Sequence, residues 1–351
     1  MQIRLGTFNC ENLYVYHRLR KLDIRFELRK KLDKNKAYKE KLAKIKYDGS
    51  GVPITSLQQG WEIKDSQRKI TASSIIENQP DIIVLQEVEN LDTLNKFYRD
   101  FMKRKVADER GIFGDKNKKV QWKMDYRILV DGNDSHRIDV ALMSRFPIKN
   151  IRTHIWDPQE GSSHPMFPRD CLEVDVEIPY KNKIITFLVN HFTSRLSDKT
   201  GTKRKNQANH VIKILQDSFG QNLDKGNFVV LGDLNDSPDD SSLKTTLYNK
   251  KHKLIDPLKQ APEEERWTHF WYSDKGKAKE VSQLDHVILS PSFKNSNPHV
   301  KIEKRGLLQT VKDLNNVGNI PVPFDGVTRE LNTEGSDHCA VYVDLEVNSL
   351  V

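Results

Sequence analysis

The sequence predicts an α/β protein in which two mixed β-sheets pack face to face and helices cover them. Three observations predict this fold class. Short apolar runs alternate with helical or polar stretches along the 351 residues, and some runs are wholly apolar while others alternate with polar residues. No repeat, low-complexity tract or Pro/Gly/Ser linker divides the chain. Wholly apolar strands are buried on both faces and alternating strands on one, so we expect a single domain over 1–351.

The expected strands are short runs rich in β-branched and aromatic residues, bounded by turn residues. These segments are Ile3–Asn9, Ile82–Gln86, Tyr126–Val130, Ile138–Met143, Cys171–Ile178, Ile184–Asn190, Phe228–Gly232, Leu284–Leu289 and Ala340–Leu345. The expected helices show apolar residues at helical spacing, and they are Ser66–Glu77, Leu91–Lys103, Lys203–Asp217 and Ser241–Tyr248.

A basic insertion at about 17–61 carries the positive charge of the chain. The segment from His17 to Lys46 contains thirteen Lys and Arg residues and four Asp and Glu residues, which gives it a net charge of +9. The whole chain has a net charge of +8, so the remainder carries about −1. Apolar residues recur there at helical spacing, which predicts two amphipathic helices with cationic outer faces. Such a run of charges is either a solvated helix face or a surface that contacts a phosphate backbone, and both interpretations stay open.

Several protein classes are disfavoured by composition. No stretch approaches the ~18 apolar residues of a membrane span, and the N-terminus enters a strand without a signal-like apolar core. Cys10, Cys171 and Cys339 are odd in number and lack C-x-x-C spacing, which argues against a disulfide framework and a structural zinc site. We therefore expect buried thiols and a cytoplasmic location, or a secreted one if a signal peptide was trimmed.

Polar residues collect at the ends of the expected strands. They are Asn9 and Glu11, Glu87, Asn190 and His191, Asp233 and Asn235, Asp285, and Asp337 and His338. A buried carboxylate is costly unless it is paired or bound to a metal, and six unrelated strands each present polar residues at a terminus. If these ends converge, they form an oxygen-rich site with at least two imidazoles, whose hard ligands favour Mg²⁺, Mn²⁺ or Ca²⁺ over zinc.

Other polar residues have structural interpretations. Asp236 to Asp240 are typical of a solvated turn. His286 alternates to the face opposite Asp285, and Asp139 lies inside a strand, so we expect both to be structural. Glu11 either joins the site or points to solvent.

The motifs "PDIIVLQEVEN", "GDLND" and "SDHCAVYVDL" stand in the order found in the endonuclease/exonuclease/phosphatase superfamily, which the chain resembles from Thr7 to Leu345. The resemblance implies a four-layer α/β/β/α sandwich like that of deoxyribonuclease I. It also implies phosphoester cleavage with a divalent metal, Mg²⁺ first, with Mn²⁺ or Ca²⁺ as alternatives. The stretches 17–61 and 301–333 match no motif of the superfamily.

The resemblance also implies roles for individual residues. Glu87 resembles the principal metal ligand, with Asn9 beside it and Asp337 as an additional metal or structural ligand. Asp233 is similar to the residue that orients or deprotonates the attacking water, and Asn235 to one that holds the phosphate or nucleophile in line. Asp285 and His338 resemble a carboxylate–imidazole pair whose His stabilises the pentacovalent phosphate.

Further resemblances concern the leaving group and the substrate. His191 stands where the deoxyribonuclease I and sphingomyelinase branches have a second His, which implies a general acid; abasic-site nucleases lack it. Arg169 resembles a phosphate-contacting Arg, and Asp170 its supporting partner. Lys203 and Arg204, in the basic loop Lys199–Lys205, are expected to border the same cleft and bind substrate.

These expectations favour a magnesium-dependent nuclease that acts on DNA rather than RNA, endonucleolytically and as a monomer. The alternative is a phosphodiesterase or phosphatase acting on lipid headgroups, as sphingomyelinases do, or on inositol phosphates, with the basic helices facing an anionic membrane. The aromatic cluster Trp267, Phe270, Trp271 and Tyr272 is compatible with bilayer contact or with a core. A binding module without activity is disfavoured because no expected site residue is missing.

Overall fold

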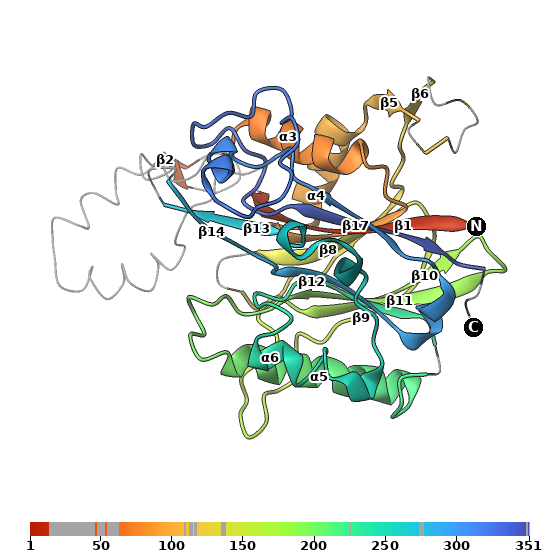
Figure 1. Ribbon diagram of the computed structural model, residues 1–351. Helices are drawn as coiled ribbons and strands as arrows, with labels where there is room; N and C mark the ends of the chain where they lie inside the picture. The colour runs from red at the N-terminus through yellow and green to blue at the C-terminus, as the bar shows by residue number, and fades with distance from the viewer. Residues whose placement is uncertain are drawn as a thin grey trace, which may run out of the picture.

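The structure, a computed structural model, describes residues 1–13, 46–47, 53–54, 63–108, 110–111, 115, 118–134, 138–224, 226–273, 277–348 and 350. Two mixed β-sheets pack face to face, and helices cover the outer face of each (Figure 1). This is the four-layer sandwich that the sequence predicted. Most of the basic insertion, with its two expected helices, lies outside the described residues. Within it the structure describes the strand pair β2 (Lys46–Tyr47) and β3 (Pro53–Ile54).

The first sheet has six strands in the order β16-β17-β1-β4-β8-β7. They are β1 (Gln2–Leu13), β4 (Ile82–Val88), β7 (Tyr126–Leu129), β8 (Asp139–Ser144), β16 (His299–Glu303) and β17 (Ala340–Glu346). β1 and β4 are parallel and the other neighbours antiparallel. Its outer face is covered by α3 (Asp65–Ile76), by α4 (Leu91–Phe97) and by a π-helical turn, Tyr98–Met102.

The second sheet has five strands in the order β15-β12-β11-β10-β9. They are β9 (Ile148–Arg152), β10 (Cys171–Ile178), β11 (Lys183–His191), β12 (Phe228–Asp233) and β15 (Asp285–Leu289). β11 and β12 are parallel, and the other neighbours are antiparallel. The outer face is covered by α5 (Thr202–Phe219) and α6 (Ser241–Lys244).

The apolar core between the sheets explains why the central strands are wholly apolar. Successive side chains point to opposite faces of a strand. Val229 and Leu231 of β12 point into the core between the sheets, while Phe228 and Val230 pack beneath α5. A central strand therefore buries both of its faces, as the run "FVVL" predicts.

A hairpin of β13 (His269–Tyr272) and β14 (Ala278–Ser282) lies beside the start of β17. The amide of Phe270 donates to the carbonyl of Asp337 at 2.9 Å, and that of Cys339 to the carbonyl of Thr268 at 2.6 Å. The hairpin packs on part of the 301–333 stretch through Leu307, Leu308 and Val311. Smaller elements are β5 (Lys105–Ala107), β6 (Lys119–Gln121) and the 3₁₀ turns Lys250–His252, Pro257–Gln260, Glu263–Glu265, Pro291–Asn295 and Gln309–Asp313.

The expected strands and helices outside the basic insertion all form, with three kinds of difference. β9, β13, β14 and β16 were missed, as were the very short strands β2, β3, β5 and β6; β9 and β16 are edge strands with exposed polar residues. The helix expected over Ser241–Tyr248 ends at Lys244, where the amide of Tyr248 bonds to the carbonyl of Leu243 at 2.9 Å and the chain turns. The helix expected over Leu91–Lys103 becomes the π-helical turn after Phe97.

The three cysteines are buried and free, as the sequence predicted. Among the helices that the structure describes, none combines the length and apolar character needed to cross a bilayer.

Candidate active site

Four parallel strands, two from each sheet, bring polar side chains to one end of the sandwich. Asn9 comes from β1 and Glu87 from β4 of the first sheet, and His191 ends β11 and Asp233 ends β12 of the second. The sheets are joined here by a hydrogen bond from Asn9 Nδ2 to Asp233 Oδ2 at 3.0 Å. The expected convergence of strand ends therefore occurs.

Gly232 sets the approach of β11 and β12. Its φ is +133°, and a Cβ at this position would lie 1.9 Å from the carbonyl oxygen of Asn190. Only glycine fits, and the resulting register places His191 directly opposite Asp233. The glycine in "GDLN" thus positions two site residues.

Backbone outliers surround the site. Glu11, Glu87 and Asn235 have positive φ values of 46°, 63° and 53°, a region that Glu rarely adopts. Strain of this kind clusters at functional sites, where neighbouring structure holds it. Here it turns side chains inward: Glu11 accepts a hydrogen bond from the Asp337 amide at 3.0 Å instead of pointing to solvent.

Asn9 links two carboxylates. Its Nδ2 also donates to Glu87 Oε1 at 3.2 Å, and its Oδ1 accepts from the Glu11 amide at 3.0 Å. The second oxygen of Glu87 accepts from the Asn12 amide at 2.9 Å. Asn9 thus holds Glu87 and Asp233 in place, and its expected role as a metal ligand stays a prediction.

His338 is fixed by a buried carboxylate, as expected. Its Nδ1 lies 2.7 Å from Oδ2 of Asp285, which also accepts from the Thr268 hydroxyl at 2.7 Å. Its Nε2 faces Asp233 Oδ2 and Asp337 Oδ1, at 3.9 Å from each. Burial opposes the charged imidazole, but the carboxylates, Asp285 first, raise the pKa of His338 well above its usual value.

His191 lies on the other side of Asp233, with its Nε2 3.4 Å from Oδ2. Its Nδ1 is buried and has no hydrogen-bond partner among the described residues. Burial, and then the positive charges of Arg169 and His338, lower the pKa of His191 well below its usual value. Burial also raises the pKa of Asp233 to about 6, against the opposing charge of His338. One carboxylate therefore lies between two imidazoles whose pKa values are shifted in opposite directions.

Asn235 is buried against Asp233. Its amide N–H donates to Asp233 Oδ1 at 2.8 Å, and its Nδ2 donates to Asp233 Oδ2 at 3.2 Å and to the Phe192 carbonyl at 3.1 Å. These bonds orient Asp233, and contact of Asn235 with a phosphate stays a prediction.

Arg169 lies near the site, but its partner differs from the expected one. Its charge acts on both Glu87 and His191, and its Nη1 donates to the Phe192 carbonyl at 2.9 Å. Its Nε is 2.7 Å from Asp134, whereas Asp170 accepts from the His154 amide and the Thr153 hydroxyl. The expectation that Asp170 supports Arg169 is wrong, because Asp170, with a φ of +65°, turns toward the loop that starts at Thr153.

Arg204 does not line the site. It is 3% exposed, its Nε donates to Asp236 Oδ2 at 2.7 Å, and its Nη1 donates to the Asp198 carbonyl at 2.8 Å. Two expectations are therefore wrong. Arg204 is not placed to bind substrate, and Asp236 is not in a solvated turn. Both side chains are buried, and they form an ion pair with each other. The turn prediction holds for the exposed Asp239, and Lys203 is exposed on the first turn of α5.

The contacts of His286 support its structural interpretation, and the structural interpretation of Asp139 stays a prediction. The ring of His286 bonds to the Asp236 carbonyl at 2.9 Å and to the Tyr248 hydroxyl at 2.6 Å. Asp139 accepts from the Gly132 amide at 2.8 Å.

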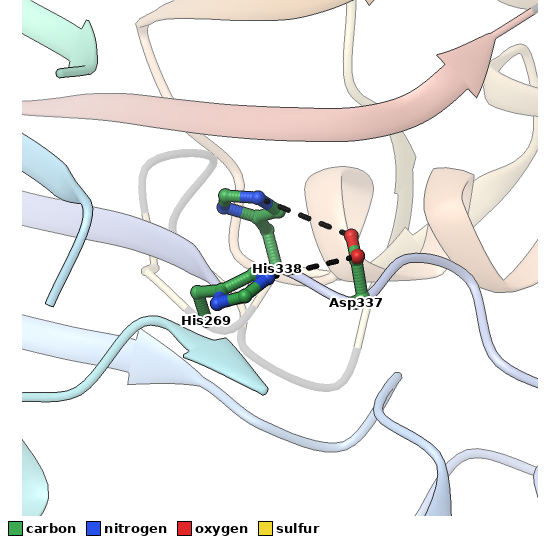
Figure 2. A group of neighbouring side chains, drawn as sticks. All are labelled: His269, Asp337 and His338. Atoms are coloured by element: carbon green, nitrogen blue, oxygen red, sulfur yellow. Dashed lines mark ion pairs between the residues drawn. The ribbon is translucent and has the colours of Figure 1, made fainter. Parts of the chain in front are cut away.

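One site residue, His269 of β13, was not predicted from the sequence. Its Nε2 lies 3.7 Å from Asp337 Oδ2, and its ring centroid is 4.6 Å from that of His338 (Figure 2). The signal was present in the alternation of "THFWY": Phe270 is buried in the core, so His269 and the half-exposed Trp271 share the other face. The residue types in this run do not show which of its two faces lies against the active site.

The donor set fits a divalent cation. Burial raises the pKa of Glu87, and the nearby charge of Asp337 raises it further. Burial, followed by the charges of Asp337 and Glu334, raises the pKa of Glu11 well above its usual value. A bound cation removes this cost, and carboxylate oxygens are the ligands that Mg²⁺, Mn²⁺ and Ca²⁺ prefer.

A family model described as "Endonuclease/Exonuclease/phosphatase family" matches residues 55–260, which include Glu87, His191 and Asp233. The chain belongs to the endonuclease/exonuclease/phosphatase family. Enzymes of this family hydrolyse phosphoester bonds and generally depend on a divalent metal. A search of curated proteins by sequence finds no match.

Solved structures of this family share the fold over nearly the whole chain. The endonuclease/exonuclease/phosphatase from Bacteroides vulgatus has 14% identity and a TM-score of 0.54, covering 99% of both chains. The human Nocturnin catalytic domain with bound sulfate has 14% identity and a TM-score of 0.54, covering 98% of this chain and 94% of that one. D. rerio TDP2 complexed with single strand DNA product has 12% identity and a TM-score of 0.55, covering 98% of each.

Proposed function

We propose that the protein is a divalent-metal-dependent phosphodiesterase that cleaves DNA endonucleolytically. The observation that carries the proposal is the placement of two imidazoles on either side of Asp233, beside Glu87. A phosphodiester has a leaving alkoxide that needs a proton and phosphoryl oxygens that need neutralising charge. A site with two differently charged imidazoles offers both.

Each side chain then has a proposed task. Glu87, with Asn9 and Asp337, holds the metal, which when bound neutralises charge on the phosphoryl oxygens. Asp233, oriented by Asn9 and Asn235, aligns and deprotonates the water. The cationic His338, held by Asp285, stabilises the phosphoryl group.

His191 is the proposed proton donor. It is neutral in the unliganded chain, because burial and nearby cations lower its pKa. An anionic phosphodiester beside it favours the imidazolium, so substrate binding supplies the condition for proton donation. Arg169 adds a fixed positive charge near Glu87 and His191.

Two features favour a nucleic acid. The indole of Trp271 is 51% exposed on the same face of β13 as His269, and aromatic rings in such positions stack on bases. The basic insertion follows β1 directly after the site residues Asn9 and Glu11, where cations are suited to phosphate contact. We include Lys203 among the residues proposed to contact the nucleic acid, because it is exposed on the first turn of α5, the helix that follows β11.

A substrate panel tests the proposal. Supercoiled plasmid, linear duplex, single strands, RNA, sphingomyelin and inositol phosphates are incubated with Mg²⁺ or with EDTA. We expect nicked and then linear plasmid, only with metal, and no product from Glu87→Ala, which controls for a contaminating nuclease. Intact plasmid together with hydrolysed sphingomyelin or inositol phosphate would refute the nuclease and support the alternative substrates.

A further inference from the structure

A groove runs along α3, on the outer face of the first sheet. One wall is a face of the helix, and the other is formed by residues 324–326 and 332–333 of the 301–333 stretch, which lies beside α3 (Figure 1). The groove has a volume of about 630 Å³. The Thr71 hydroxyl donates to the Gly335 carbonyl at 2.7 Å, which ties the helix to the segment that follows this wall. The stretch that closes the groove matches no motif of the family.

The groove is cationic. Its charged lining residues are the cations Lys64, Lys69, Arg104 and Lys105 and the acids Glu77 and Asp325. Glu77 is already paired, because its carboxylate oxygens lie 3.6 Å from Arg104 and 3.3 Å from Arg305. Lys69 and Lys105 are exposed, and no described residue forms an ion pair with either of them. The lining therefore attracts an anionic ligand.

An aromatic ring lines the same groove. Phe324 begins a turn that is closed by a hydrogen bond from the Val327 amide to the Phe324 carbonyl at 3.1 Å. The guanidinium of Arg305 lies 4.3 Å from the centre of the Phe324 ring, and Glu303 holds that guanidinium at 2.6 Å. These contacts fix the position of the ring. Cations beside a fixed aromatic ring are typical of surfaces that bind single-stranded nucleic acids, because the cations contact the backbone and a base stacks on the ring.

One end of the groove adjoins the active site. The Thr333 amide donates to Oε2 of Glu334 at 2.8 Å, and Oε1 of Glu334 accepts from the Tyr272 hydroxyl at 2.8 Å. The charge of Glu334 also acts on Glu11 in the active site. Tyr272 follows Trp271 on β13, and Trp271 is the residue proposed to stack on bases. The groove therefore continues the surface that is proposed to contact the nucleic acid.

We propose that the groove binds a single-stranded segment of the nucleic acid next to the bond that is cleaved. The inference rests on the proposed function and adds a preference for substrates with a single-stranded extension. Its volume is that of a small-ligand pocket, too small for a duplex, while its α3 wall extends about 17 Å from Ser66 to Glu77. Stacking on Phe324 also requires a base that is free of duplex stacking.

Binding without cleavage tests the groove. A labelled oligo-dT strand is titrated with the full chain in EDTA, and the affinity is measured by fluorescence anisotropy at several salt concentrations. Wild type should bind the strand. Replacing Lys69 and Lys105 together by Gln should flatten the slope of log K against log salt by about 1.4, since each phosphate contact of a single strand contributes about 0.7. The matched control Lys213→Gln removes an exposed cation from α5, which covers the other sheet, and should leave the slope unchanged.

A third variant separates stacking from charge. Phe324→Leu should weaken oligo-dT binding by roughly fivefold or more and leave the binding of a strand without bases unchanged. Equal salt slopes in wild type and the double Lys variant would overturn the groove as a strand site, and so would a dT mononucleotide that binds as tightly as the strand. The proposed nuclease survives either result, whereas a wild-type protein that binds neither single strands nor duplex refutes both proposals.

Discussion

Replacing Arg204 by Met should destabilise the protein without weakening substrate binding, whereas replacing its exposed neighbour Lys203 by Met should leave the stability of the fold unchanged. Arg204 and Lys203 are adjacent on the first turn of α5, and the sequence assigned both to substrate binding. The structure separates them: Arg204 is buried against Asp198 and Asp236, and Lys203 is exposed.

The size of the effect follows from the contacts of the guanidinium. Removing one partner of a buried ion pair costs about 3–5 kcal/mol, because the other charge stays buried. Asp236 keeps two donors, Arg195 and Ser242, so the lower end, about 3 kcal/mol, applies. At roughly 2.1 cal/mol/K of unfolding entropy per residue, a chain of 351 residues loses about 4 °C in melting temperature. A surface change such as Lys203→Met stays within about 0.5 kcal/mol.

Thermal unfolding by circular dichroism and steady-state kinetics on DNA, at a temperature well below both midpoints, measure the two properties separately. We expect a lower midpoint and an unchanged KM for Arg204→Met. A midpoint within 1 °C of wild type, combined with a raised KM, would show that Arg204 contacts substrate and that the buried pair contributes little.

Three other predictions test the site and its surroundings. His191→Ala and His338→Ala should both impair cleavage. If His191 protonates the leaving oxygen, a substrate with a nitrophenolate leaving group should restore the activity of the His191 variant only. Restored activity in the His338 variant alone would reverse the two roles. Trp271→Ala should weaken single-strand binding by about 1–3 kcal/mol in EDTA, measured by fluorescence anisotropy, and an equal loss on an oligonucleotide that lacks bases would exclude stacking. Burial lowers the pKa of His154, but its two carboxylate partners raise it more, so the net shift is upward. The stability that the protonated His154 adds to the fold is therefore complete below its unfolded-state pKa of 6.5, and it is lost as pH rises through its folded-state pKa. The melting temperature of His154→Gln should therefore fall furthest below that of wild type near pH 6, with the gap narrowing as pH rises through the folded pKa.

The sequence predicted the layers of the fold because buried strands and helices have characteristic patterns of apolar residues. Central strands such as Phe228–Asp233 are apolar on both faces, and Gly232 marks the close approach of two strands. The edge strands β9 and β16 were missed because a strand with one paired side and exposed polar residues has the composition of a loop. Their identity as strands comes from the neighbours they pair with, which lie far away in the sequence.

The sequence predicted the placement of polar residues that end buried strands, but not contacts between segments far apart in the chain. Glu87, His191 and Asp233 follow apolar runs, so their position in the sequence gives their position in space. Arg204 lies on the first turn of α5 and Asp236 in an acidic turn, and nothing local shows that the two segments meet. His269 was missed for the same reason, because its contact with His338 joins segments nearly seventy residues apart.

The site is divided between the two sheets, and this division limits where substrate choice can arise. The first sheet supplies Asn9, Glu87 and His338, while Asp233 and Asp285 come from the second. Two hydrogen bonds, from Asn9 to Asp233 and between His338 and Asp285, cross the interface close to the apolar core. Because that core is close-packed, the distances between the two halves are fixed by packing and change little with the substrate.

A rigid phosphate site of this kind does not by itself distinguish DNA from a lipid headgroup or an inositol phosphate. Among the described residues, discrimination has to come from what surrounds it: the β13–β14 hairpin with Trp271 and the loops that follow β11 and β12. The hairpin is tied to the active site, since the strand that exposes Trp271 also places His269 Nε2 3.7 Å from Asp337. A substrate group that stacks on Trp271 therefore contacts the strand that places His269 beside Asp337 and His338.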